Sequence, residues 1–85
     1  MAKDYTVISR KIVEQIGGID NIANVTHCMT RLRFVLKDET LADDEAVKAF
    51  DGVMGLVKQG GQYQIIIGNH VGTAYQEVLK LGNFG

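Results

Sequence analysis

Proline and tryptophan are absent from the 85-residue sequence, and cysteine occurs once, at position 28. A single cysteine cannot form an intramolecular disulfide, which excludes a small secreted domain held together by disulfides. No apolar run approaches the roughly 18 residues of a membrane-spanning helix. Residues 1–10 also lack the apolar core of a signal peptide. These absences predict a soluble cytoplasmic domain.

The two signs of charge are nearly balanced: nine Lys and Arg residues and ten Asp and Glu residues give a net charge of -1. Nucleic-acid-binding domains usually carry a basic excess, so we expect no nucleic-acid partner. The hydrophobic content of 46% is ordinary for a globular protein. Residues 1–85 are predicted to form one domain, since each of two halves would have only a marginal core.

Apolar residues recur at helical or alternating spacing along the whole chain. The predicted helices are 5–16, 43–50 and 70–81, and the predicted strands are 24–28, 31–36, 53–58 and 62–67. Residues 19–23 are expected to form a short turn or one more helical turn. Gly17-Gly18 should end the first helix, and Gly60-Gly61 should turn the second hairpin. The order α-β-β-α-β-β-α predicts an α+β fold, a two-layer sandwich with the helices on one face of the sheet.

The second predicted strand shows the clearest alternation in the sequence. Leu32, Phe34 and Leu36 should face a core. Arg31 and Arg33 should then share the opposite, wetter face of the sheet, close to the hairpin end where the cysteine lies.

Cys28 lies in a stretch of the chain that is free of acidic residues. No Asp or Glu occurs from position 21 to position 37, whereas two arginines follow the cysteine closely. Nearby cations favour the thiolate, which is the reactive form of cysteine. Backbone amides of Met29, Thr30 and Arg31 at a hairpin end could form an anion nest, to which Arg33 and the Thr30 hydroxyl add donors. We therefore identify Cys28 as the candidate nucleophile and Met29, Thr30, Arg31 and Arg33 as candidate phosphate-binding residues.

Other interpretations of these residues must be weighed. A lone cysteine is often a small buried hydrophobe, and strand arginines are often only solvated surface, so the residues alone leave both readings open. A cysteine phosphatase loop places an arginine six residues after its cysteine, where this sequence has Phe34. His27 should point away from Cys28, because adjacent strand residues face opposite ways, which disfavours a metal site and a Cys–His pair. His70 is expected to be a surface residue.

The stretch 60–64 is a second candidate region. Its glycine pair is not followed by the lysine and helix of a nucleotide-binding loop, so we interpret it as a turn. Gln62 and Gln64 would share one face of the following strand. They are possible border residues of the cysteine site if the two hairpins lie side by side.

The stretch 25–34, with its Cys-x-Thr-Arg-Leu-Arg core, resembles the enzyme IIB domain of the bacterial phosphoenolpyruvate-dependent sugar phosphotransferase system. The match is to the glucose and sucrose/β-glucoside group, and β-glucoside transporters look most similar, with sucrose and trehalose transporters as close competitors. Further matching blocks are 17–18, 52–55 and 60–68. The resemblance covers nearly the whole chain.

The resemblance implies a four-stranded antiparallel sheet of order 1-2-4-3 with three helices on one face. It also implies a phosphoryl carrier: a phosphohistidine on a IIA partner would phosphorylate Cys28, and a sugar held by a membrane IIC partner would receive the group. Arg31 and Arg33 would stabilise the phosphate charge, with Thr30 beside them, and no metal or cofactor is implied. The expected location is the cytoplasmic side of the membrane, as a soluble domain of a longer transporter whose sugar cannot be read from this sequence. The alternative function is a cysteine-based redox-sensing or regulatory binding domain.

Overall fold

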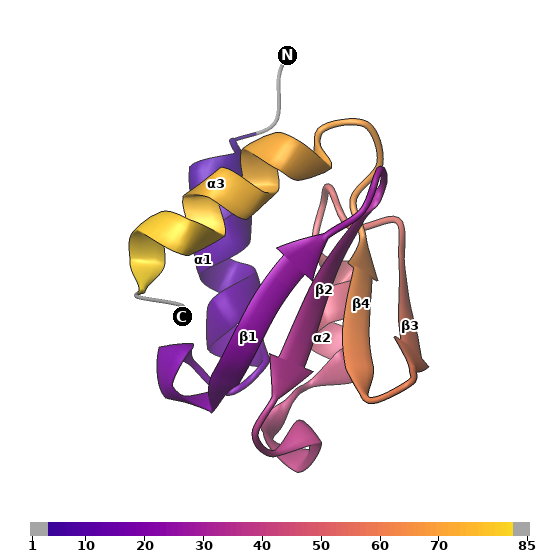
Figure 1. Ribbon diagram of the computed structural model, residues 1–85. Coiled ribbons are helices and arrows are strands. Elements are labelled where there is room, and N and C mark those ends of the chain that lie inside the picture. Colours follow the sequence, from indigo (N-terminus) through magenta and orange to yellow (C-terminus); the bar gives the residue numbers. More distant parts are fainter. Residues whose placement is uncertain (1–3, 83–85) are drawn as a thin grey trace.

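The computed structural model, which describes residues 4–82, contains three α-helices and four strands in the predicted order, together with two short 3-10 helices, Ile19–Asn21 and Glu39–Leu41. The α-helices and strands are α1 (Tyr5–Gln15), β1 (Ile22–His27), β2 (Arg31–Leu36), α2 (Asp44–Ala49), β3 (Gly55–Gln59), β4 (Gln62–Ile66) and α3 (Val71–Leu81). The strands form one antiparallel sheet of order β1-β2-β4-β3, and the helices cover one of its faces (Figure 1). The α+β two-layer fold and the strand order are confirmed.

The boundaries of β1, β3 and β4 differ from the prediction, and β4 ends at Ile66 rather than at position 67. β1 begins at Ile22 rather than at position 24 and ends at His27, so Cys28 lies just beyond the strand. A bulge between Ile22 and Asn24 inserts one extra residue, and as a result Ile22 and Val25 are both buried although they are three positions apart. β3 begins at Gly55 rather than at position 53.

The core lies between the sheet and the helices. Leu32, Phe34 and Leu36 of β2 are buried in it, as their alternation predicted. Each fully buried aliphatic or aromatic side chain stabilises the fold by about 1.5–3 kcal/mol relative to an exposed one. The core residues of the helices are Ile8, Ile12, Val13, Val47, Val71, Ala74 and Val78. Among residues 4–82, no helix has the length and apolar character required to cross a membrane.

Two glycine pairs set the connections that were predicted for them. Gly17 and Gly18 have φ angles of 108° and 86°, and the Gly18 amide donates to the Val13 carbonyl at 2.8 Å and ends α1. Gly60 and Gly61 have φ angles of 61° and 77° and form the tight turn between β3 and β4. A residue with a side chain would be strained at these positions.

A buried polar contact ties α2 to the sheet. Tyr63 of β4 is fully buried, and its hydroxyl donates to Asp44 Oδ1 at 2.8 Å. Lys58 of β3 donates to the other oxygen of the same carboxylate at 2.7 Å. The Lys58 hydrogen bond, together with the Tyr63 hydroxyl, holds the pKa of Asp44 below its ordinary 3.8. The short helix α2 is therefore anchored by a carboxylate with two donors.

We expect Tyr63→Phe to lower the free energy of unfolding by about 1–2 kcal/mol, because it removes a hydrogen bond to a charged group. Since the pKa of Asp44 is depressed in the folded state, this contribution is present above pH 3.8 and is lost as the pH falls through the lower folded value. Urea unfolding at neutral and acidic pH measures the difference. Tyr75→Phe is the matched control, because it removes a hydroxyl from a half-buried tyrosine of α3. An equal effect of both variants would contradict the stabilising role of the Tyr63–Asp44 hydrogen bond.

Candidate functional site

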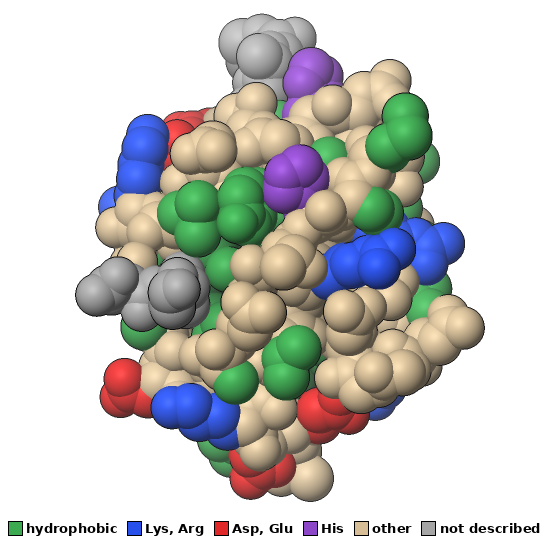
Figure 2. Space-filling view, in the orientation of Figure 1, with side chains coloured by type: hydrophobic (Ala, Val, Ile, Leu, Met, Phe, Trp, Pro, Cys, Tyr) green, Lys and Arg blue, Asp and Glu red, His purple; other side chains and the backbone are tan. Residues whose placement is uncertain are grey.

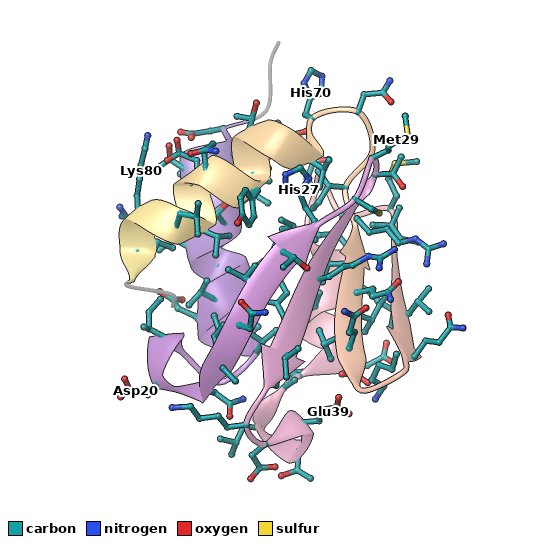
Figure 3. The ribbon with its side chains drawn as sticks, in the orientation of Figure 1. Asp20, His27, Met29, Glu39, His70 and Lys80 are labelled. Carbon is teal, nitrogen blue, oxygen red and sulfur yellow. The ribbon has the colours of Figure 1, made fainter. Side chains whose placement is uncertain are left out.

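Cys28 lies in the hairpin loop between β1 and β2, on the open face of the sheet. Its amide donates to the Arg31 carbonyl at 3.0 Å and closes the loop. His27 and Leu32 are the last paired residues of β1 and β2 before the loop, and they lie on the side of the sheet that the helices cover. Because successive residues alternate between the two faces, Cys28 and Arg31 fall on the opposite side. The thiol is partly exposed. Figure 3 shows Met29 at the tip of this hairpin and His27 on the side of α3.

His27 supports the backbone of the loop and does not pair with the sulfur. Its ring lies 4.5 Å from that of Tyr75, between centroids, on α3. Its Nδ1 donates to the carbonyl of Cys28 at 2.9 Å, because a carbonyl oxygen can only accept. The prediction that His27 and Cys28 point to opposite faces is confirmed. Within residues 4–82, no group of three His, Cys, Asp or Glu side chains is placed to hold a metal ion.

The loop stabilises the thiolate form of Cys28. Hydrogen bonding from the Thr30 amide is the largest cause that lowers the thiol pKa, and partial burial opposes it. The Arg31 amide and the Arg33 guanidinium, through a hydrogen bond and its charge, lower the pKa further. The net result is a fall from an ordinary 9.0 to about 7. The thiolate is therefore more accessible at neutral pH than in a free cysteine.

The end of β4 holds the loop from the other side. The Thr30 carbonyl accepts the amides of Ile67 and Gly68, at 2.8 and 2.9 Å. Gly68 has a φ of 98°, and a Cβ there would lie 3.2 Å from Met54 Sδ. The sequence did not identify Ile67 and Gly68 as supports of the loop, because neither the end of an apolar run nor a matching block says which carbonyl their amides bind.

The two arginines of β2 have different environments. The guanidinium of Arg33 acts on the thiol, and its Nε is a buried nitrogen without a hydrogen-bond partner among the described residues. The Nη1 of Arg31 instead donates to Gln64 Oε1 at 2.9 Å. Figure 2 shows a group of Lys and Arg side chains over the upper half of β2 and β4 with no Asp or Glu beside it. An anion at the sulfur would meet several donors and no competing carboxylate.

Gln64 and Gln62 lie beside the arginines, because β4 pairs with β2. Gln64 is directly opposite Arg33 in the strand register and is only 6% exposed. Its Nε2 donates to Gln62 Oε1 at 3.0 Å. The two glutamines that the sequence suggested as border residues thus extend the polar site across the open face.

The remaining candidates lie at the margin of the site. Met29 is 88% exposed at the tip of the hairpin, and the amides that lower the thiol pKa are those of Thr30 and Arg31. The Thr30 side chain is exposed. His70 is exposed immediately before α3 and its ring lies 5.8 Å from that of Tyr5, which confirms its surface position.

Comparisons with known proteins place this geometry in context. Residues 10–43, which include the cysteine loop, match the family model described as phosphotransferase system, EIIB. The arbutin-, cellobiose-, and salicin-specific EIIBC component of Escherichia coli is 52% identical over 95% of this chain. The beta-glucoside-specific EIIBCA component of Bacillus subtilis is 45% identical over 94%. The chain spans only 17% and 13% of the length of these two relatives.

A solved structure resembles the whole described fold. It is one domain of the PTS system IIabc component from Clostridium difficile, with a TM-score of 0.87 and 43% sequence identity. The match covers 92% of this chain and 82% of that one. The likeness therefore extends over both hairpins and the helical layer.

We expect iodoacetamide to alkylate Cys28 with a rate that rises with pH around a midpoint near 7, because only the thiolate reacts. Arg33→Gln should move the midpoint upward, and alkylation at pH 7 should slow by about threefold when this charge is lost. Lys37→Gln removes an equal charge just beyond the other end of β2 and should leave the midpoint in place. A midpoint near 9.0 in the unaltered protein would contradict the thiolate-stabilising loop.

Proposed function

This chain belongs to the phosphotransferase system EIIB family, and on that premise we propose that it is a phosphoryl-carrier domain whose acceptor is Cys28. The observation that supports this role most directly is the thiol with a pKa of about 7, set among amide and guanidinium donors on an open face. The Nε of Arg33 is a buried donor without a partner among the described residues. A cysteine that served only packing would need neither feature.

The first step is transfer from a phosphohistidine of a IIA partner. The Cys28 thiolate attacks phosphorus in line with the histidine nitrogen, so that an S–P bond forms as the N–P bond breaks, and the histidine nitrogen leaves with the bonding pair. Such a transfer requires positioning and charge stabilisation more than a general acid or base. The amides of Thr30 and Arg31 and the guanidinium of Arg33 would provide both, since all three already stabilise the thiolate.

The second step passes the group to a sugar held by a membrane IIC partner. A sugar hydroxyl attacks phosphorus, the S–P bond breaks, and the sulfur leaves as a thiolate while the hydroxyl proton goes to solvent or to the partner. The donors that stabilise the thiolate before the first step also stabilise it as a leaving group in the second. A thiol of ordinary pKa would leave less readily.

The printed names of the relatives suggest the context of these steps. They are EIIBC and EIIBCA components, so we propose that the domain acts within a longer membrane transporter, on the cytoplasmic side, next to a IIC part and in contact with a IIA part. The named substrates of these relatives include β-glucosides, arbutin and salicin, and we propose a β-glucoside as the transported sugar. The open face of the sheet lets both partners reach the same sulfur in turn, through small and transient contacts.

We expect Cys28→Ser to abolish phosphorylation by a phosphoryl-donor relay and to leave the thermal midpoint nearly unchanged, because the thiol lies at a partly exposed hairpin end. Intact-protein mass spectrometry measures one added phosphoryl group on the unaltered domain and none on the variant. Gross unfolding of the variant would contradict the open-site placement. Oxidation of Cys28 to sulfenic acid without any phosphorylation would instead support a redox-sensing function.

Arg33→Lys should impair transfer to the sugar by about tenfold or more, because lysine keeps the charge but cannot offer the planar fork of donors. The measurement is sugar phosphorylation by membranes that contain the longer protein with this substitution. The alkylation midpoint of the domain should rise less than in Arg33→Gln, since lysine keeps the positive charge and loses only the hydrogen bond of the guanidinium. Unchanged sugar phosphorylation would refute the role given to Arg33.

A further inference from the structure

The two arginines of β2 lie on one face of one strand, yet they have different partners. Arg33 lowers the pKa of the thiol with its guanidinium, whereas Arg31 lowers it only through its backbone amide. The Arg31 side chain donates from Nη1 to Gln64 Oε1 at 2.9 Å. The position of the Arg31 guanidinium is therefore set by Gln64 and not by the sulfur.

Gln64 is itself held in one orientation. It is 6% exposed, and its Nε2 donates to Gln62 Oε1 at 3.0 Å. A guanidinium has only donors, so the amide oxygen of Gln64 must face Arg31 and its amide nitrogen must face Gln62. The three side chains form a directed chain of hydrogen bonds across the open face, from Arg31 to Gln64 to Gln62.

We propose that Gln64 is a positioning residue that holds the Arg31 guanidinium for an anion bound at Cys28 without cancelling its charge. A carboxylate at position 64 would also bind the arginine, but it would neutralise the guanidinium and repel a phosphate. The neutral amide fixes the side chain through one hydrogen bond. The remaining N–H groups of the guanidinium and its full positive charge stay available.

The two arginines therefore have different roles, and this inference rests on the proposed function of Cys28. Arg33 acts on the unphosphorylated thiol and stabilises its thiolate form. Arg31 acts when an anionic group arrives at the sulfur, because Gln64 already fixes its charge on the face of the sheet that carries Arg33. Ordering the guanidinium before the anion arrives lowers the entropy cost of binding it.

Two alkylating reagents test this proposal without any phosphoryl donor. Iodoacetamide is neutral and iodoacetate is anionic, and with both the thiolate forms a bond to carbon while iodide leaves. The ratio of the iodoacetate rate to the iodoacetamide rate therefore reports the positive charge that an anion meets at the sulfur. Gln64→Met keeps a similar side-chain volume and removes the acceptor. We expect Gln64→Met to lower this ratio by about threefold, because the charge of the Arg31 guanidinium is no longer held in place and the site is accessible to water.

The iodoacetamide midpoint should remain near 7 in Gln64→Met, because the groups that set it are untouched. Gln59→Met, at an exposed position of β3, is the matched control and should leave the ratio unchanged. Arg31→Met should lower the ratio as far as Gln64→Met, and the double variant should lower it no further. A purely structural role of Gln64 would give additive losses or no change in the ratio, and either result would overturn the proposal.

Gln64→Glu provides a second variant in case the methionine is not tolerated in the sheet. It keeps an acceptor for Arg31 and adds a negative charge, so the ratio should fall at least as far as in Gln64→Met. A native ratio in Gln64→Glu would contradict the need for a neutral amide. A donor relay then separates the two hypotheses: the expected ratios without phosphorylation of Cys28 would defeat the proposed function alone, and phosphorylation with unchanged ratios would defeat the role of Gln64 alone.

Discussion

The antiparallel pairing of β2 with β4 joins two hairpins that would otherwise be separate local structures. On the inner side it brings Phe34 against Tyr63 and completes the core beneath the helices. On the outer side the same register places Gln64 opposite Arg33 and brings the end of β4 to the cysteine loop. Stability and chemistry thus depend on one set of hydrogen bonds, because a slip of one residue would exchange the two faces.

The electrostatics of the site are local and are not visible in the net charge of -1. The acidic side chains that structure the domain act elsewhere: Asp44 anchors α2, and Asp4 and Asp43 cap helices. The face around Cys28 keeps amide and guanidinium donors without carboxylates to offset them. A carrier must bind a highly charged group and release it again, and donors of moderate strength at a partly exposed sulfur suit both demands better than a buried ion pair.

Much of this arrangement could be predicted from the sequence, because it depends on short-range periodicity. The alternation in β2 placed Arg31 and Arg33 on the face opposite Phe34, and the same rule separated His27 from Cys28. The strand order came from the family resemblance, since spacing alone does not specify which hairpin strands pair. The hydrogen bond between Arg31 and Gln64 joins residues 33 positions apart, so it depends on a register that local patterns do not encode. The bulge in β1 and the supports of the Thr30 carbonyl escaped prediction for the same reason.

The Thr30 carbonyl accepts hydrogen bonds from two successive amides at the end of the other hairpin. The sheet therefore holds the reactive loop in place before any partner binds. The hydrogen bonds that hold this loop come from the backbone of the domain itself. Under the proposed function, each partner would meet a loop that is already held in place, as in the association of two rigid bodies. Evolution could therefore tune the throughput of the relay from the rim of the contact surface, while the chemistry at its centre stays fixed.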